Sequence, residues 1–127
     1  MIRFSLIARI VLTLCFMALL AFLSLIPGYH QPGDSVFTWL VEKTPTLMQK
    51  ALHICLYGVL ALLLAWCLES IQSRAYRILF CLIIAVAFGA VMEWCQTKVP
   101  GRYGTAYDVA LNAAGAILGV LAAVTLR

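Results

Sequence analysis

Charged side chains are scarce in this chain of 127 residues. Nine Lys and Arg and five Asp and Glu make up only 11% of it, whereas apolar residues make up 65%. Soluble proteins use about 25% charged residues. Fourteen charges are too few to cover a globule of 14.0 kDa in water, and the high apolar content excludes a disordered chain. The composition is typical of an integral membrane protein.

Repeats, low-complexity segments and stretches typical of a soluble domain are also absent. At this length, residues 1–127 are expected to form a single domain. The five cysteines are odd in number and show no C-x-x-C spacing, which argues against a disulfide framework or a zinc site. They are expected to pack as small apolar side chains in helices. We expect no cofactor and no nucleic-acid partner.

Long apolar runs occur at residues 10–26, 51–68, 78–92 and 109–126. A helix needs about 20 mostly apolar residues to cross a bilayer. The third run is short, and it reaches that length only if Glu93 and Gln96 lie in its last turn. The first run is longer than the ~7–15 apolar residues of a signal peptide, so we expect it to be retained. The chain is therefore predicted to be an all-α integral membrane protein with four transmembrane helices.

The longest connection, residues 27–50, joins the first two runs. It contains apolar residues at roughly helical spacing, namely Val36, Phe37, Leu40 and Val41. Asp34 stands in front of them, where it could cap a helix. A short interfacial or re-entrant helix is predicted in this loop.

The two ends of the predicted bundle differ in charge. Lys and Arg in short loops set the orientation of a membrane protein, with the more basic side in the cytoplasm. One end carries five positive charges and one negative, from Arg3, Arg9, Glu69, Arg74, Arg77 and Arg127. The other carries four of each sign, from Asp34, Glu42, Lys43, Lys50, Glu93, Lys98, Arg102 and Asp108. Both termini are therefore predicted to be cytoplasmic, with the second end facing outward.

Polar residues gather at this outer end. The second, third and fourth helices each carry them at spacings of three, four or seven residues, so they share one face of each helix. Because the chain crosses the membrane an even number of times, these ends lie at the same depth and the side chains can converge. The residues are Lys50, His53 and Tyr57 on the second helix, Glu93 and Gln96 on the third, Arg102 in the following turn, and Asp108 and Asn112 on the fourth.

Two glycines continue the polar stripe of the fourth helix. Gly115 and Gly119 form a small-xxx-small pair, which lets a helix pack closely on a neighbour. Such packing would turn Asp108 and Asn112 toward the interior. A homo-oligomer formed through these glycines is one possible partner arrangement.

The outer residues support several kinds of chemistry. His53 with Glu93 or Asp108 could form an acid–base pair, since a carboxylate fixes the tautomer of an imidazole and stabilises its charged form. The same three residues could bind a metal ion, although their spacing is not diagnostic. A purely structural reading stands beside these, in which Asp108 caps the fourth helix.

The outer cations suggest an anionic ligand. Lys50, Lys98 and Arg102 could hold a phosphate, and Arg102 offers the better hydrogen-bonding fork. In the structural alternative, Lys50 extends its side chain toward water, Lys98 is solvated surface and Tyr57 is packing.

In order along the chain, these residues form the patterns K-x-x-H (50–53), E-x-x-Q (93–96), P-G-R (100–102) and D-x-x-x-N-x-x-G-x-x-x-G (108–119). The ordered set resembles the signature of the VanZ-like membrane protein family. Many members carry an Asp just before the Lys, where this chain has Gln49. The resemblance implies a small, multi-pass bacterial inner-membrane protein. The founding member of the family is associated with resistance to teicoplanin, a lipid-bearing glycopeptide that acts on lipid-linked cell-wall precursor.

We therefore expect an outward-facing polar pocket that binds or processes an amphiphile. The ligand would be a phospholipid, a polyprenyl-phosphate-linked cell-wall precursor or a lipoglycopeptide such as teicoplanin. A catalytic form would be a transferase or hydrolase acting on a lipid headgroup. The alternative is a non-catalytic accessory or assembly subunit of an envelope complex, whose polar end only docks partner helices. The expected catalytic residues are His53, Glu93 and Asp108, and the expected binding residues are Lys50, Gln96, Arg102, Asn112 and Tyr57.

Overall fold

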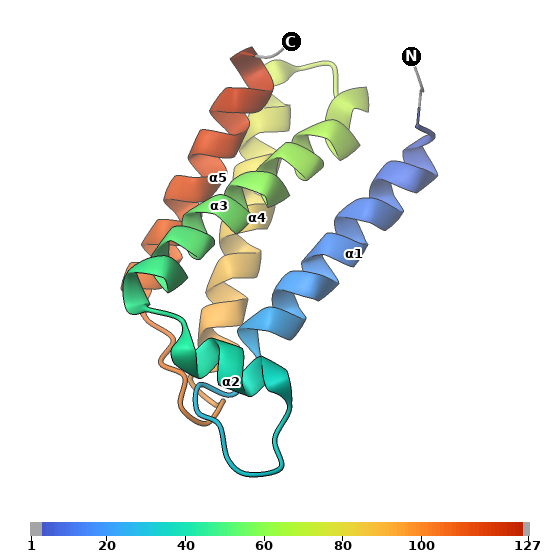
Figure 1. Ribbon diagram of the computed structural model, residues 1–127. Helices are drawn as coiled ribbons and strands as arrows, with labels where there is room; N and C mark the ends of the chain where they lie inside the picture. The colour runs from blue at the N-terminus through green and yellow to red at the C-terminus, as the bar shows by residue number, and fades with distance from the viewer. Residues whose placement is uncertain (1–3, 126–127) are drawn as a thin grey trace.

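The computed structural model describes residues 4–125, and within this range it is all-helical. The helices are α1 (Leu6–Ser24), α2 (Val36–Lys43), α3 (Thr46–Cys67), α4 (Arg74–Gln96) and α5 (Ala106–Thr125), with a short 3₁₀ turn, Leu68–Ser70, after α3 (Figure 1). Four of them, α1, α3 with its 3₁₀ turn, α4 and α5, are long and apolar enough to cross a membrane. The predicted number of spans is confirmed.

All four helices begin before the apolar runs that predicted them, whereas α1 ends at Ser24, two residues before its run does. The third span begins at Arg74, because the hydroxyl of Ser73 accepts a hydrogen bond from the Tyr76 amide and caps the helix. It ends at Gln96, so Glu93 and Gln96 lie in its last turn, as its length required. The predicted end of the last run at residue 126 lies outside the described residues.

A short helix, α2, forms in the long first connection, as the apolar spacing indicated. Its N-cap residue is Ser35, so the prediction of Asp34 as the cap is wrong. The carboxylate of Asp34 instead accepts a hydrogen bond from the backbone N–H of Gln31 at 2.9 Å, which closes the turn before the helix. An interfacial or re-entrant placement of α2 stays a prediction.

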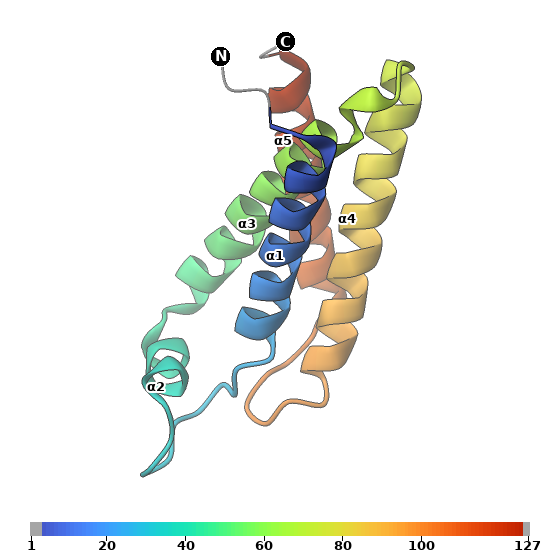
Figure 2. The same cartoon turned by 90° about the vertical axis from the view of Figure 1, so that its right-hand side faces the viewer.

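The start of α1 and the end of α5 lie at one end of the bundle, and α2 and the 97–105 connection lie at the other (Figures 1 and 2). The core lies between α3, α4 and α5, where Leu60, Ala61, Cys81, Ala85 and Ala116 are fully buried. Along α1, only Thr13 and Leu20 are buried. The first helix is therefore the least enclosed of the spans.

Helices α3 and α5 pack closely through the two glycines of α5. A Cβ atom placed on Gly115 would lie 2.2 Å from the carbonyl oxygen of Ile54, and one on Gly119 would lie 2.2 Å from that of Gly58. This contact turns Asn112 into the interior, where it is fully buried. The glycine face is thus filled within one chain, and a homo-oligomer through it stays a prediction.

At the terminal end, Arg9 joins α1 to the end of α3. Its guanidinium pairs with Glu69, donates to the carbonyl oxygen of Trp66 and stacks on the Trp66 ring. The predicted topology also used Arg3 and Arg127, which lie outside the described residues. Cytoplasmic placement of the termini stays a prediction.

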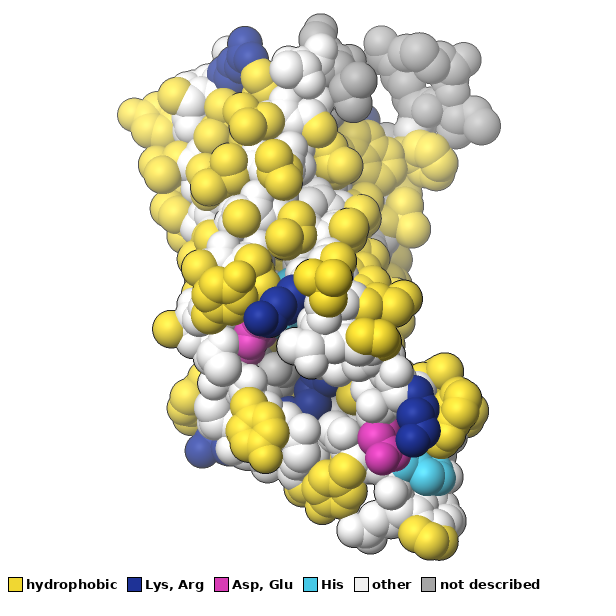
Figure 3. All heavy atoms as spheres, turned by 60° about the vertical axis from the view of Figure 1, so that its left-hand side comes forward, with side chains coloured by type: hydrophobic (Ala, Val, Ile, Leu, Met, Phe, Trp, Pro, Cys, Tyr) yellow, Lys and Arg dark blue, Asp and Glu magenta, His cyan; other side chains and the backbone are white. Residues whose placement is uncertain are grey.

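Hydrophobic side chains cover most of the surface toward the terminal end (Figure 3). Charged and histidine side chains gather toward the α2 end of this face, and some of them lie within a hollow. Such a distribution is typical of a protein whose sides face lipid.

Candidate functional site

Three helices contribute to one buried polar contact. The Nδ1 atom of His53, on α3, lies 2.8 Å from Oδ1 of Asn112, on α5. The Nδ2 atom of Asn112 donates to Oε1 of Glu93, on α4, at 3.5 Å. The same carboxylate oxygen lies 3.6 Å from His53 Nδ1. Of the two carboxylates predicted as partners of His53, Glu93 is the one within 4 Å of its ring.

Glu93 is only 4% exposed, and a loop amide satisfies its second oxygen. Its Oε2 atom accepts a hydrogen bond from the backbone N–H of Thr105 at 3.3 Å. Burial of a carboxylate near lipid is costly unless such partners compensate for the lost water. The Thr105 contact ties the 97–105 connection to α4 and fixes the carboxylate beside Asn112.

Asp108 lies apart from this contact. Its carboxylate accepts a hydrogen bond from the Thr105 hydroxyl at 2.6 Å, and its amide donates to that hydroxyl at 3.1 Å. This is the capping interaction of a first-turn acidic residue, with Thr105 preceding the helix. Within residues 4–125, no group of three or more His, Cys, Asp or Glu is arranged to hold a metal ion, so the metal alternative has no ligand set.

A cavity of about 290 Å³, the polar lobe, lies beside the His53 contact. It is lined by residues of helices α2, α3, α4 and α5, by the 97–105 connection and by Gly28. Most of the predicted site residues face it: Lys50, His53, Gln96, Arg102 and Asp108. The charges lining this lobe are of both signs: the cations of Lys50 and Arg102, and the carboxylate of Asp108, which accepts from the Thr105 hydroxyl.

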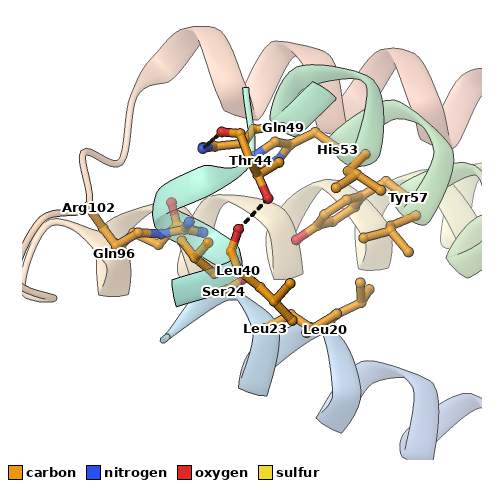
Figure 4. Close-up of a pocket in the computed structure, with 13 residues that line it drawn as sticks. Leu20, Leu23, Ser24, Leu40, Thr44, Gln49, His53, Tyr57, Gln96 and Arg102 are labelled. Atoms are coloured by element: carbon orange, nitrogen blue, oxygen red, sulfur yellow. Dashed lines mark hydrogen bonds between the residues drawn. The ribbon is translucent and has the colours of Figure 1, made fainter. Parts of the chain in front are cut away.

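A second cavity of about 220 Å³, the apolar lobe, lies between α1, α2 and α3 (Figure 4). Its walls include Leu20 and Leu23 from α1, and Leu52 and Leu56 from α3. Both lobes share a set of lining residues and therefore adjoin. These residues are Val41, Gln49, His53, Gln96 and Arg102.

Arg102 lies at the boundary of the two lobes. Within the described residues, its guanidinium forms no ion pair and no side-chain hydrogen bond. Burial lowers the pKa of this guanidinium from its ordinary value, while the carboxylates of Glu93 and Asp108 oppose the shift. A partly desolvated cation without a close counter-ion is stabilised when an anion binds beside it.

The other two outer cations differ in position. The ammonium of Lys50 lies 4.9 Å from the centre of the Tyr107 ring, at the wall of the polar lobe. Lys98 is exposed and stacks on Trp94, 4.8 Å from its ring centre, and it lines neither lobe. Of the three cations suggested for a phosphate, only Lys50 and Arg102 face the cavity.

Tyr57 and Gln96 are buried residues of the cavity wall. Tyr57 packs near Phe88, with ring centres 6.3 Å apart, and its hydroxyl points into the apolar lobe (Figure 4). Gln96 lies opposite it, beside Arg102. Both residues add hydrogen-bonding groups to a wall that is otherwise largely apolar.

The sequence did not point to Thr105 or Gln49 as parts of the site. A signal for Thr105 was present, because Thr-x-x-Asp over residues 105–108 is a helix-start pattern. Gln49 precedes Lys50 in α3, and it lines both lobes. The side-chain amide of Gln49 donates a hydrogen bond to the backbone carbonyl oxygen of Thr44 at 2.9 Å. This bond ties α3 to the end of α2.

Comparison with known proteins gives one match. The family model described as VanZ/LLP1 matches residues 4–127, which is nearly the whole chain. No curated protein and no solved structure matches.

Proposed function

The chain belongs to the VanZ/LLP1 family, and we propose that this membrane protein binds an amphiphile with an anionic headgroup in its two-lobed cavity. The headgroup occupies the polar lobe, and one hydrocarbon chain enters the apolar lobe. Phospholipids and polyprenyl-phosphate-linked precursors share this chemistry, and a lipoglycopeptide is a third candidate.

The position of Arg102 carries the proposal. The guanidinium faces both lobes, is partly desolvated and has no ion-pair partner among residues 4–125. A guanidinium binds phosphate through two parallel hydrogen bonds, which makes it well suited to a lipid headgroup. Lys50 adds a second cation to the wall of the same lobe.

The apolar lobe supports a lipid over a free anion. Leucines of α1 and α3 form much of its wall, and it adjoins the polar lobe at Arg102. Small-molecule sites usually measure about 300–1,000 Å³, so each lobe of 220 or 290 Å³ is small for a complete lipid. The site therefore fits a headgroup and the nearest part of one chain, with the remainder in the bilayer.

The orientation is a second part of the proposal. An excess of basic residues at the terminal end supports cytoplasmic termini, and with that orientation the cavity opens toward the outer leaflet of the bacterial inner membrane. Lipid-linked cell-wall precursors and glycopeptides are both present on that side.

The test is lipid retention by an Arg102 variant. The wild-type protein is purified with native lipids, and bound species are identified by native mass spectrometry. Phosphatidylglycerol and polyprenyl phosphate are then added separately to distinguish the two lipid sources. We expect Arg102→Gln to lose the bound lipid and Lys98→Gln, which removes a cation outside the cavity, to retain it. Equal retention by both folded variants would contradict the proposal.

A further inference from the structure

We propose that His53 is the catalytic base for the hydrolysis, by water, of a phosphoester linkage in the headgroup of the bound lipid. This inference rests on the proposed binding function and adds an activity to it. It depends on the hydrogen-bonded chain from His53 through Asn112 to Glu93, and on the two cations that line the same lobe.

The chain of hydrogen bonds determines which nitrogen of His53 carries the proton. An ionised Glu93 carboxylate only accepts hydrogen bonds, so in that state the amide nitrogen of Asn112 faces it and the amide oxygen faces His53. Nδ1 of His53 must then be the donor in the 2.8 Å contact with that oxygen. In a neutral imidazole, Nε2 consequently holds the lone pair.

The Nε2 atom is available to a ligand. His53 lines both lobes, and Nδ1 is the ring nitrogen engaged by the protein. The polar lobe, at about 290 Å³, has room for a headgroup together with a water molecule, whose share of liquid volume is about 30 Å³. The base therefore lines a cavity with room for both a headgroup and a water molecule.

Glu93 stabilises the charge that forms on the base. Its Oε1 atom lies 3.6 Å from Nδ1 of His53, and the Thr105 amide holds its other oxygen in place. When Nε2 takes up a proton, the imidazolium gains a nearby carboxylate, as in the base–orienter arrangement of hydrolytic enzymes. Asn112 and Glu93 are positioning residues in this scheme, and of the three only His53 meets the reacting atoms.

The step is a hydrolysis by water. Nε2 of His53 removes a proton from a water molecule as the water oxygen forms a bond to phosphorus. The P–O bond to the leaving alcohol breaks. The proton on Nε2 then passes to the leaving oxygen, so the base is regenerated. Arg102 and Lys50, which line the same lobe, stabilise the negative charge that develops on the phosphoryl oxygens.

The experiment measures incorporation of heavy oxygen from labelled water. The full chain is reconstituted in vesicles of phosphatidylethanolamine and phosphatidylglycerol, with or without a polyprenyl phosphate. Mass spectrometry then identifies any phosphate product that carries the label. Labelled product in the vesicles without polyprenyl phosphate indicates a phospholipid substrate. Labelled product only after its addition indicates the polyprenyl linkage.

The two histidines of the chain provide a matched pair of variants. His53→Gln keeps a hydrogen-bonding side chain but cannot take up the proton, and we expect it to lower kcat by about 10²-fold or more. His30→Gln alters a histidine that bonds Thr38 and lines neither lobe, so the rate should be unchanged. Glu93→Gln should lower kcat and leave KM unchanged, because it removes charge from a group that does not touch the lipid.

The experiment distinguishes failure of the proposed lipid binding from failure of the proposed catalytic role. Wild-type protein that retains lipid but yields no labelled product in either vesicle overturns the catalytic role and leaves the binding proposal standing. Equal rates in wild type and folded His53→Gln also overturn it. Loss of lipid retention in the wild type itself contradicts the proposed function.

Discussion

Nδ1 of His53 and Oδ1 of Asn112 lie 2.8 Å apart although 59 positions separate the two residues in the chain. The contact joins α3 to α5 next to Glu93, and Asn112 is fully buried. A buried amide between an imidazole and a carboxylate satisfies groups on both sides at once. The polar centre of the protein therefore depends on this single side chain.

Replacing Asn112 by Ala should destabilise the protein strongly. The change leaves His53 without its Nδ1 partner and Glu93 without one of its donors, at about 1–3 kcal/mol for each unsatisfied group. Thermal unfolding in detergent measures the loss. Thr125→Val, at an exposed hydroxyl on the same helix, is the control and should change stability by less than about 0.5 kcal/mol. Equal melting temperatures for the two variants would contradict a central role of Asn112.

Replacing Gly115 by Leu should separate α3 from α5. Even a Cβ atom there would lie 2.2 Å from the Ile54 carbonyl oxygen, so a larger side chain forces the two backbones apart. Overpacking of this kind costs about 1–3 kcal/mol or more, which exceeds the gain of about 1 kcal/mol from removing a helical glycine. Ala114→Leu, on the exposed side of the same helix, is the matched control. A stable Gly115→Leu variant would refute the close packing.

Much of this centre follows from helical spacing alone. Residues 53, 93 and 112 lie on polar stripes at the same end of three helices, and an even number of spans brings those ends to one depth. The fold class and the convergence of polar groups are therefore predictable from periodicity and charge. The resemblance to the family is confirmed by a match over nearly the whole chain.

Other parts of the site depend on contacts that spacing does not reveal. The choice of Glu93 over Asp108 as the neighbour of His53 arises because the Thr105 hydroxyl engages Asp108. The apolar lobe needs leucines of α1 brought beside α3, and no periodicity within either helix fixes that distance. Helix α2 begins after Ser35, and the Asp34 carboxylate closes the preceding turn.

A reporter enzyme fused after Arg127 tests the orientation. The excess of basic residues at the terminal end predicts a cytoplasmic reporter. A second fusion within the 27–35 segment, which lies near the cavity, should report a periplasmic location. The opposite pair of signals would place the cavity at the cytoplasmic leaflet and exclude ligands confined to the outer side.

Filling the apolar lobe should distinguish binding of the lipid's hydrocarbon chain from binding of its headgroup. Leu23→Trp places a larger ring in a cavity of about 220 Å³, at a half-buried position on α1. We expect this variant to lose bound lipid, because the chain no longer fits, while glycerol phosphate still binds in the polar lobe beside Arg102. Native mass spectrometry measures the lipid, and isothermal calorimetry measures glycerol phosphate.

Phe22→Trp is the matched control for this change. Phe22 is the preceding residue of the same helix, is 52% exposed and packs on Phe37, with ring centres 5.6 Å apart. Neither ring lines the apolar lobe, so a larger ring at position 22 should leave the lobe open. Lipid retention should then equal that of the wild type. Lipid retention by Leu23→Trp as well would show that the hydrocarbon chain of the lipid lies outside the apolar lobe. Simultaneous loss of lipid and glycerol phosphate in folded Leu23→Trp would show that the two lobes do not act as separate binding sites.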